Sequence, residues 1–254
     1  MQLDLTDQTI LVTGASRGIG RASAEALAEA GATVAVHYGH SPDAAAEVVE
    51  TCGRDARSFQ ADLSTLEATD SLVDRVVEAY GRLDTVVLNA GVAVSAPMDA
   101  PTERWNDAWT ETMRVNLRAP ELLCRHTLRH FQRQQPSGGR IISVASRAAF
   151  RGDTPDYITY AASKAGLVAL TRSIARGFGD EGVKAFTLAP GFTRTNMAQD
   201  FIDEYGEDHA TSDLALNRLT EPADVASHVV FLASGQADHA TGTTIDVNAG
   251  SYVH

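Results

Sequence analysis

The stretch Thr13-Gly14-Ala15-Ser16-Arg17-Gly18-Ile19-Gly20 decides the fold of this 254-residue chain. It follows a short apolar run and opens an amphipathic pattern, so it predicts a strand, a glycine-rich turn and a helix in succession. Glycines in such a turn permit the tight bend and let backbone N–H groups approach a pyrophosphate. The helix N-terminus adds a partial positive charge. The sequence therefore predicts a dinucleotide cradle formed by Gly14, Ser16, Arg17, Gly18, Ile19 and Gly20.

Short β-rich runs alternate with helical patterns along the rest of the chain. Strands are expected at 9–13, 33–37, 56–60, 85–88, 140–144, 183–188 and 244–247. Helices are expected at 18–30, 43–51, 66–80, 103–134 (bent at Pro120), 157–179 and 222–233. Several of the strands are continuously apolar, which is typical of parallel strands covered on both faces. The pattern predicts an α/β fold: a single domain over residues 1–254, with a doubly wound parallel sheet of about seven strands, a Rossmann fold.

Composition and charge exclude several classes of protein. The net charge of −12 argues against nucleic-acid binding and against association with anionic membranes. No apolar run approaches the roughly 18 residues that a membrane span requires, and the first residues do not read as a signal peptide. We therefore expect a cytoplasmic protein. Cys52 and Cys124 fit two buried thiols better than a disulfide in that compartment.

The stretch Tyr160-Ala161-Ala162-Ser163-Lys164 carries the chemistry. It places a phenol and an ammonium four residues apart, on one face of the expected helix. A nearby cation stabilises phenolate, so we expect Lys164 to lower the pKa of Tyr160 from about 10 toward working pH. Such a tyrosine can exchange a proton with a carbonyl or an alcohol. A half-buried tyrosine beside a solvated lysine is the structural alternative, and the glycine-rich stretch argues against it.

The spacing G-x-x-x-G-x-G together with Tyr160 and Lys164 closely resembles the short-chain dehydrogenase/reductase family, over nearly the whole chain. The resemblance implies a catalytic tetrad of Asn116, Ser146, Tyr160 and Lys164. It also implies that the cofactor is bound by Tyr160, Lys164, Asp62, Leu63, Asn89, Ala90, Gly91, Pro190, Gly191, Thr193 and Thr195. Leu88 departs from the family pattern, which more often has a second Asn there.

Roles for the tetrad follow from the charge that develops during carbonyl reduction. Ser146 donates a hydrogen bond to the substrate oxygen, and Tyr160 delivers the proton. Lys164 tunes Tyr160 and holds the nicotinamide ribose, and Asn116 anchors a water path. An exposed helical Asn is the alternative for Asn116. No metal is required.

Three other groups of residues compete for these roles. Ser143 is expected to hydrogen-bond inside the core, and Tyr157 lacks a Lys four residues later. His126 and His130 are one helical turn apart, but no third metal ligand is visible near them, so a solvated or interface position is expected.

Cofactor choice depends on the end of the second strand. Family members that prefer NAD place an acidic residue there. Here the position falls on His37 or, more plausibly, Tyr38, neither of which repels a 2′-phosphate. Arg17 and Ser41, with His40, could contact that phosphate. We therefore expect NADP(H) rather than NAD(H), although Gly39 stands where a basic residue is often found.

The expected function is NADP(H)-dependent reduction of a carbonyl, most like the 3-oxoacyl-(acyl-carrier-protein) reductase branch of the family. We expect the substrate to be a small molecule or carrier-bound, and residues 191–219 to form a substrate lid. The resemblance implies that the assembly is a homotetramer. An alcohol, sugar or steroid dehydrogenase that works oxidatively is the alternative among enzymes. A non-catalytic dinucleotide sensor is the alternative from another class, and the filled tetrad argues against it.

Overall fold

Seven parallel strands form one sheet at the centre of the computed structural model, which describes residues 3–53, 55–195 and 211–253. The strand order is β3-β2-β1-β4-β5-β6-β7. The strands are β1 (Thr9–Val12), β2 (Thr33–Tyr38), β3 (Arg57–Gln60), β4 (Thr85–Leu88), β5 (Gly139–Val144), β6 (Val183–Pro190) and β7 (Thr244–Val247). The order runs outward in both directions from β1 and β4, so the crevice between their carboxyl ends is where such a sheet binds ligands.

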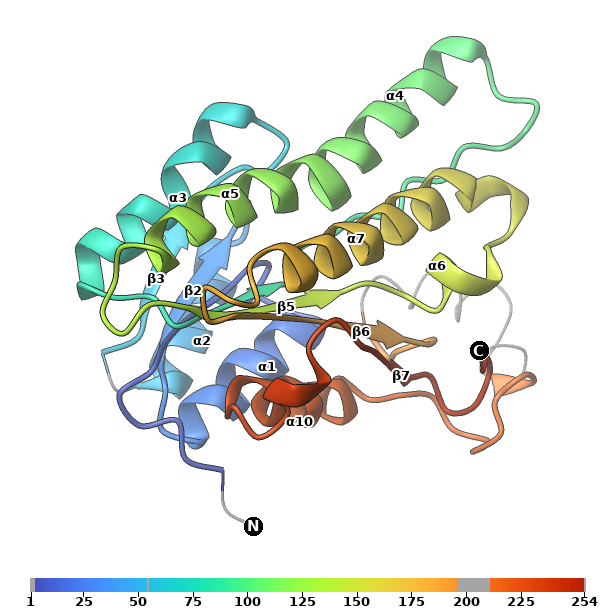
Figure 1. Ribbon diagram of the computed structural model, residues 1–254. Helices are drawn as coiled ribbons and strands as arrows, with labels where there is room; N and C mark the ends of the chain where they lie inside the picture. The colour runs from blue at the N-terminus through green and yellow to red at the C-terminus, as the bar shows by residue number, and fades with distance from the viewer. Residues whose placement is uncertain (1–2, 54, 196–210, 254) are drawn as a thin grey trace.

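Helices cover both faces of the sheet (Figure 1). One face carries α1 (Gly18–Glu29), α2 (Pro42–Cys52) and α10 (Pro222–Ala233). The other carries α3 (Leu66–Tyr80), α4 (Thr102–Met113), α5 (Ala119–Phe131) and α7 (Ile158–Gly177). Shorter elements are α6 (Ala148–Arg151), the π-helical η1 (Arg114–Arg118), and the 3₁₀ turns η2 (Pro155–Tyr157) and η3 (Asp238–Ala240).

The two helical layers enclose two apolar clusters, one on each face of the sheet. Every residue of β1 and β4 is buried, as the continuously apolar patterns predict. Cys52 and Cys124 are buried and free, one in each cluster. The predicted doubly wound Rossmann fold is confirmed.

The expected helix over 103–134 differs from what is found. It divides into α4, the five-residue π segment η1 and α5. Pro120 lies in the first turn of α5 and has no N–H to donate to the carbonyl of Asn116. The N–H of Ala119 instead bonds to the carbonyl of Arg114, five residues back. The missing donor accounts for the π geometry just before the proline, and π segments of this kind are often found at functional sites.

Two expectations about organisation remain predictions. The single domain over residues 1–254 is one of them. The lid expected over 191–219 is the other, because 196–210 lie outside the described residues. Within the described residues, no helix is both long and apolar enough to cross a membrane.

Candidate active site

The glycine-rich turn between β1 and α1 needs its glycines for two distinct reasons. Gly14 and Gly18 have φ values of +62° and +55°, a region in which other residues are strained. Gly20 has no room for a side chain, because an added Cβ would lie 2.2 Å from the carbonyl oxygen of Gly14. An added Cβ at Gly18 would lie 3.1 Å from Cγ2 of Thr195. The turn and the segment after β6 therefore approach each other across the crevice.

His37 holds this turn in place, a role that the sequence did not reveal. Its Nδ1 accepts a hydrogen bond from the N–H of Gly14, and its Nε2 lies 3.0 Å from the carbonyl oxygen of Ala61. These partners require the neutral ring with the proton on Nε2. The pKa of His37 is lowered from 6.5 to about 4, chiefly by burial; the hydrogen bond to Ala61 raises it and the charge of Arg75 lowers it. Hence a neutral histidine ties β1, β2 and the end of β3 together.

Asn89-Ala90-Gly91 follows β4 and joins the glycine-rich turn to Lys164, a member of the predicted tetrad. The Asn89 side chain donates to the carbonyl oxygens of Thr13 and Gly14. The backbone N–H groups of Asn89 and Ala90 both donate to the Thr13 hydroxyl. An added Cβ at Gly91 would lie 3.2 Å from both Asn116 Oδ1 and Lys164 Nζ. Leu88, which departs from the family pattern, is a core residue that is 2% exposed.

The predicted adenine end of the site lies at the carboxyl ends of β2 and β3. β2 ends at Tyr38, which is half-buried, whereas His37 is only 2% exposed. Tyr38 is therefore the better placed of the two alternatives to meet a ribose. Asp62 accepts from the N–H of Ser64, and hydrogen bonds from Ser64 lower the pKa of Asp62. The side chain of Leu63 packs in the core. Arg17, at the start of α1, and Ser41, at the start of α2, are exposed.

Pro190, Gly191, Thr193 and Thr195 lie at the end of β6 and just after it. The N–H of Gly191 donates to the carbonyl oxygen of Val247, and an added Cβ would lie 2.7 Å from Cα of Asn248. The backbone N–H of Arg194 donates to the carbonyl oxygen of Thr220. Both ends of the predicted lid are therefore joined close to β6.

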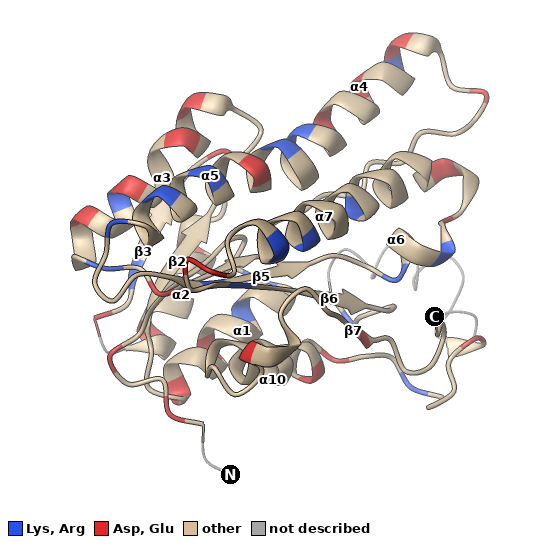
Figure 2. Cartoon of the chain, in the orientation of Figure 1, with Lys and Arg blue, Asp and Glu red and all other residues tan. Residues whose placement is uncertain are grey.

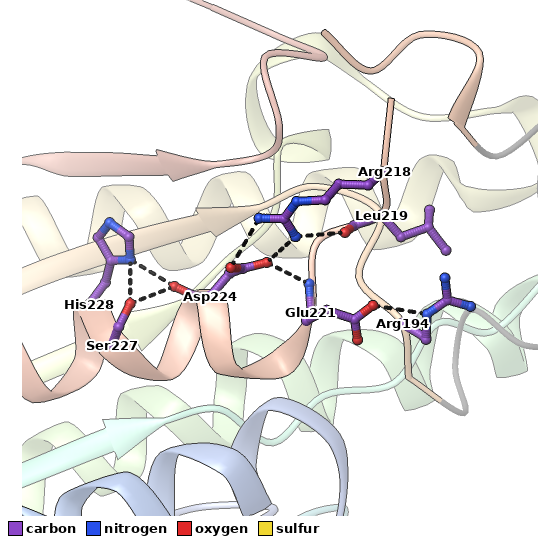
Figure 3. Close-up of polar contacts among 7 residues, drawn as sticks. All are labelled: Arg194, Arg218, Leu219, Glu221, Asp224, Ser227 and His228. Atoms are coloured by element: carbon purple, nitrogen blue, oxygen red, sulfur yellow. Dashed lines mark hydrogen bonds and ion pairs between the residues drawn. The ribbon is translucent and has the colours of Figure 1, made fainter. Parts of the chain in front are cut away.

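Ion pairs reinforce this junction, as Figure 3 shows. Arg194 Nε lies 3.0 Å from Glu221 Oε1, and Arg218 Nη1 lies 2.9 Å from Asp224 Oδ2. Glu221 and Asp224 also form a capping box at the start of α10. The junction is thus coupled to a helix that packs against α1 on the far face of the sheet.

Ser146, Tyr160 and Lys164 lie together at the carboxyl end of β5. Ser146 follows that strand by two residues, and hydrogen bonding to Ser146 lowers the pKa of Tyr160. Lys164 is one turn beyond Tyr160 in α7, and its Nζ lies 5.7 Å from the centre of the Tyr160 ring. The ammonium donates to the carbonyl oxygen of Val144, the last residue of β5. Tyr160 and Lys164 of α7 therefore lie next to Ser146 and the end of β5.

Asn116 is fully buried in η1, which removes the alternative of an exposed helical Asn. Its side chain accepts from the N–H of Val92 and donates to the carbonyl oxygen of the same residue, both at 2.8 Å. It also donates to Ser163 Oγ, which in turn donates to the carbonyl oxygen of Tyr160. Asn116 therefore links the chain after β4 to the helix that carries Tyr160 and Lys164.

The pKa values of the two titratable groups differ from the sequence expectation. Burial raises the pKa of Tyr160 to about 12; Ser146 lowers it and Asp153 raises it. Burial also lowers the pKa of Lys164 to about 8. The expected lowering of the Tyr160 pKa by Lys164 is thus not found, because desolvation of the phenol outweighs nearby stabilisation. The lysine responds to the same burial by holding its proton less tightly.

The competing residues take structural positions. Ser143 is buried in β5, and its Oγ accepts from Thr171 Oγ1, as expected for a core serine. Tyr157 lies at the start of α7. His126 Nε2 lies 2.7 Å from Asp70 Oδ1, between α5 and α3. Within the described ranges, no group of three or more potential ligands is arranged to hold a metal ion.

The crevice fits a dinucleotide on the evidence of its backbone. Gly14 and Gly18 form the tight turn beside it, and Gly18 and Gly91 are points where a side chain would crowd Thr195 and Lys164. These glycines lie between β1 and β4, at the switch point of the sheet. The tetrad adjoins the same crevice at β5. The arrangement can hold a dinucleotide beside a proton donor.

This combination of fold and site defines a class. A family model described as enoyl-(acyl carrier protein) reductase matches residues 14–252. The chain belongs to the short-chain dehydrogenase/reductase family, and it is an NAD(P)-dependent oxidoreductase.

Several relatives have similar sequence identity to this chain. The 3-oxoacyl-(acyl-carrier-protein) reductase FabG of Vibrio harveyi is 35% identical over 99% of this chain and 100% of its own length. A short-chain dehydrogenase of Burkholderia cenocepacia, solved in complex with NADP, is 35% identical over 99% of both chains, with a TM-score of 0.89. A protein of Beutenbergia cavernae, described as a putative NAD(P)-dependent gluconate 5-dehydrogenase, is 33% identical over 99% of both chains, with a TM-score of 0.86.

Proposed function

We propose that this protein is an NADP(H)-dependent carbonyl reductase that acts on 3-oxoacyl thioesters. The observation that carries the proposal is the convergence of Asn116, Ser146, Tyr160 and Lys164 beside the glycine-rich crevice. Similarity to the Vibrio harveyi reductase supports the substrate class. The bound dinucleotide supplies the hydride.

The chain's own residues then manage the oxygen and the proton. Ser146 donates a hydrogen bond to the substrate oxygen, where negative charge grows. Tyr160 gives that oxygen its proton, and a pKa of about 12 keeps the phenol protonated for this purpose at neutral pH. Lys164, with a pKa of about 8, is the nearby group that exchanges protons near neutrality. Asn116 holds the chain after β4 against α7, so that the three groups keep their spacing.

We propose NADP(H) over NAD(H) on the basis of the residues at the end of β2. Tyr38 carries no charge to repel a 2′-phosphate, and Arg17, His40 and Ser41 are exposed, the last two directly after β2 and Arg17 at the start of α1. The NADP complex of the Burkholderia cenocepacia relative supports this preference.

A screen of NADPH oxidation tests the proposed activity. Purified protein is assayed with 3-oxoacyl thioesters, ketoses, quinones and steroids, and the highest kcat/KM is expected for a 3-oxoacyl thioester. NADPH binding without turnover of any member of the panel would favour the dinucleotide sensor instead.

An oxidative sugar or alcohol dehydrogenase is the second candidate, favoured by the similarity to the Beutenbergia cavernae protein. It predicts NADP-dependent oxidation of a polyol or sugar acid with a kcat/KM above that of any thioester reduction. The same screen, run in the oxidative direction, distinguishes the two.

The proposed assembly is a homotetramer in the cytoplasm, with an acyl carrier protein as partner. Exposed arginines follow α5 and α7 in Figure 2, although the net charge is −12; they include Arg125, Arg129, Arg133, Arg172 and Arg176. Exposed cations on one helix face repel each other, and an acidic partner surface would relieve that repulsion. The partner is either a neighbouring subunit or an acidic carrier protein. The buried thiols fit a reducing compartment.

A charge-reversal pair separates the carrier from the subunit. Arg129→Glu plus Arg172→Glu should weaken turnover of a carrier-bound thioester and spare a small soluble thioester. Arg57→Glu plus Arg104→Glu is the matched control on other exposed surfaces. Equal loss on both substrates, or dissociation into monomers in analytical ultracentrifugation, would show that the arginines serve assembly alone.

A further inference from the structure

Two arginines lie next to the proposed catalytic serine, and the proposed reaction uses neither of them. Arg147 directly follows Ser146, and its backbone N–H donates to the carbonyl oxygen of Pro190. Its backbone therefore lies between the ends of β5 and β6, at the carboxyl edge of the sheet. Arg151 is the last residue of α6, one helical turn further on.

The two guanidinium groups converge on one carboxylate oxygen. Arg147 Nη1 and Arg151 Nη1 each lie 3.0 Å from Oδ2 of Asp213. Asp213 belongs to the segment that leads to Thr220 and α10, on the substrate side of the crevice. The space between the arginines thus already accepts a carboxylate, provided by the chain itself.

This site has unused capacity for an anion. The Arg147 side chain is only 12% exposed, and of its five N–H groups one is hydrogen-bonded within the described residues. Burial, and then the charge of Arg151, lower the pKa of Arg147, while Asp213 and Asp153 raise it. A guanidinium that is largely buried and incompletely hydrogen-bonded gains from a further anionic partner.

The dinucleotide does not account for this site. Its pyrophosphate is expected at the turn after β1, and a 2′-phosphate is expected at the end of β2. In the sheet order these strands are two and three places from β5, or about 10 and 14 Å at the usual strand spacing. The arginines instead adjoin Ser146, where the substrate oxygen is expected.

We propose that Arg147 and Arg151 form a subsite for a carboxylate carried by the substrate, close to the reacting carbonyl, and that Asp213 is its internal competitor. The proposal rests on the proposed role of Ser146 and Tyr160, because they fix where that carbonyl lies. It adds to the proposed function that the substrate carries a free carboxylate besides its oxo group, as in a 3-oxoacyl thioester with a carboxylate on its acyl chain or in an oxo acid, with the corresponding hydroxy acids as substrates in the oxidative direction.

Oxo acids and their methyl esters test the subsite with NADPH as cofactor. The panel varies the number of carbons between the oxo group and the carboxylate, and the readout is the ratio of kcat/KM for the acid to that for its ester. Arg147→Gln should lower this ratio about tenfold, the size expected from losing one charge-assisted hydrogen bond. Asp213→Asn should raise it, because the competitor loses its charge. Arg151→Gln should also lower the acid-to-ester ratio, and it leaves the buried Arg147 in place.

A subsite predicts that Arg147→Gln and Asp213→Asn change the acid-to-ester ratio in opposite directions. If the two residues formed only a structural ion pair, both variants would lose activity on acid and ester alike. Arg104→Gln, at an exposed position on α4, is the control and should leave the ratio unchanged. Melting temperatures of all variants show whether any has failed to fold.

A binding measurement decides the question even if no panel member is turned over. Calorimetric titration of the NADPH-loaded protein with butyrate and with butyramide should show tighter binding of butyrate in the wild type only, and not in Arg147→Gln or Arg151→Gln. Equal affinity for the two probes, or butyrate binding that the arginine variants leave unchanged, overturns the proposal. Reduction of a neutral thioester with no response to these variants would reject the subsite and keep the proposed reductase function.

Discussion

The two halves of the crevice are held together by different forces. On the cofactor side, buried neutral groups bind to the backbone: His37 to Gly14 and Ala61, Thr13 to Asn89 and Ala90. On the substrate side, charged side chains bind to each other, across the surface in Arg194–Glu221 and Arg218–Asp224 and with a largely buried guanidinium in Arg147–Asp213. Exposed ion pairs contribute about 0–1 kcal/mol each and weaken with salt. We therefore expect the cofactor side to keep its hydrogen bonds when ligands bind, whereas the ion pairs of the substrate side can be replaced by contacts with a charged ligand.

Tyr160 joins the two halves, so its loss should have the largest effect. Tyr160→Phe removes the proton donor and keeps the ring, and we expect kcat to fall by about 10²–10⁴-fold. NADPH affinity, measured by fluorescence titration, should stay close to that of the wild type. A variant that retained a tenth or more of the wild-type rate would show that the acid has been assigned to the wrong residue.

Lys164→Met should damage both halves at once. The ammonium bonds to the end of β5, lies beside Gly91 and faces the Tyr160 ring. We expect a lower kcat together with a higher Kd for NADPH, in contrast to Tyr160→Phe. An unchanged Kd for NADPH would show that Lys164 acts in catalysis only and does not bind the cofactor.

Tyr38→Asp should change only the choice of cofactor. An acidic side chain at the end of β2 repels a 2′-phosphate and can accept from a ribose 2′-hydroxyl. The kcat/KM ratio of NADPH to NADH should fall by about tenfold or more, equal to at least about 1.4 kcal/mol. Equal or better kcat/KM with NADH in the wild type would overturn the NADP(H) assignment before any substitution is made.

His37 permits a finer test of the cofactor side. Asn can place an acceptor near the position of Nδ1 and keep the bond to Gly14, whereas Gln reaches the position of Nε2 and keeps the bond to Ala61. We expect His37→Gln to raise the Kd for NADPH about tenfold and His37→Asn to raise it less, with kcat at saturation little changed in both. Equal effects of the two variants would reduce His37 to a packing residue.

The same histidine makes the fold sensitive to acid. Its pKa is about 4 in the folded chain and 6.5 when unfolded, so the unfolded chain binds the extra proton first. The contribution of neutral His37 to the free energy of unfolding is fully present above pH 6.5, and up to about 3 kcal/mol of it is lost as the pH falls toward 4. Denaturant unfolding of the wild type and of His37→Asn at pH 7.5 and pH 5 should show a smaller pH difference in the variant.

Sequence patterns predicted the strands and the glycine-rich turn of the cofactor side, whereas they missed several features of the substrate side, for a physical reason. The glycine-rich turn and the apolar strands are local in the chain, and their periodicity predicted the sheet. The helix over 103–134 was missed at η1, because the effect of Pro120 is felt at the carbonyl of Asn116. The raised pKa of Tyr160 depends on burial, which the spacing to Lys164 does not reveal. Arg147 meets Asp213 only through the fold, across 66 residues of chain.

The separation of the two halves can be measured directly in the double variant His37→Gln plus Arg147→Gln. The strands that carry these sites are three places apart in the sheet, about 14 Å, and effects at sites this distant usually add. The NADPH Kd of the double variant should equal that of His37→Gln, and its acid-to-ester ratio should equal that of Arg147→Gln. A Kd that changes further when Arg147 is replaced, or a ratio that changes further when His37 is replaced, would contradict the account of a fixed cofactor side and an independent, charge-selecting substrate side.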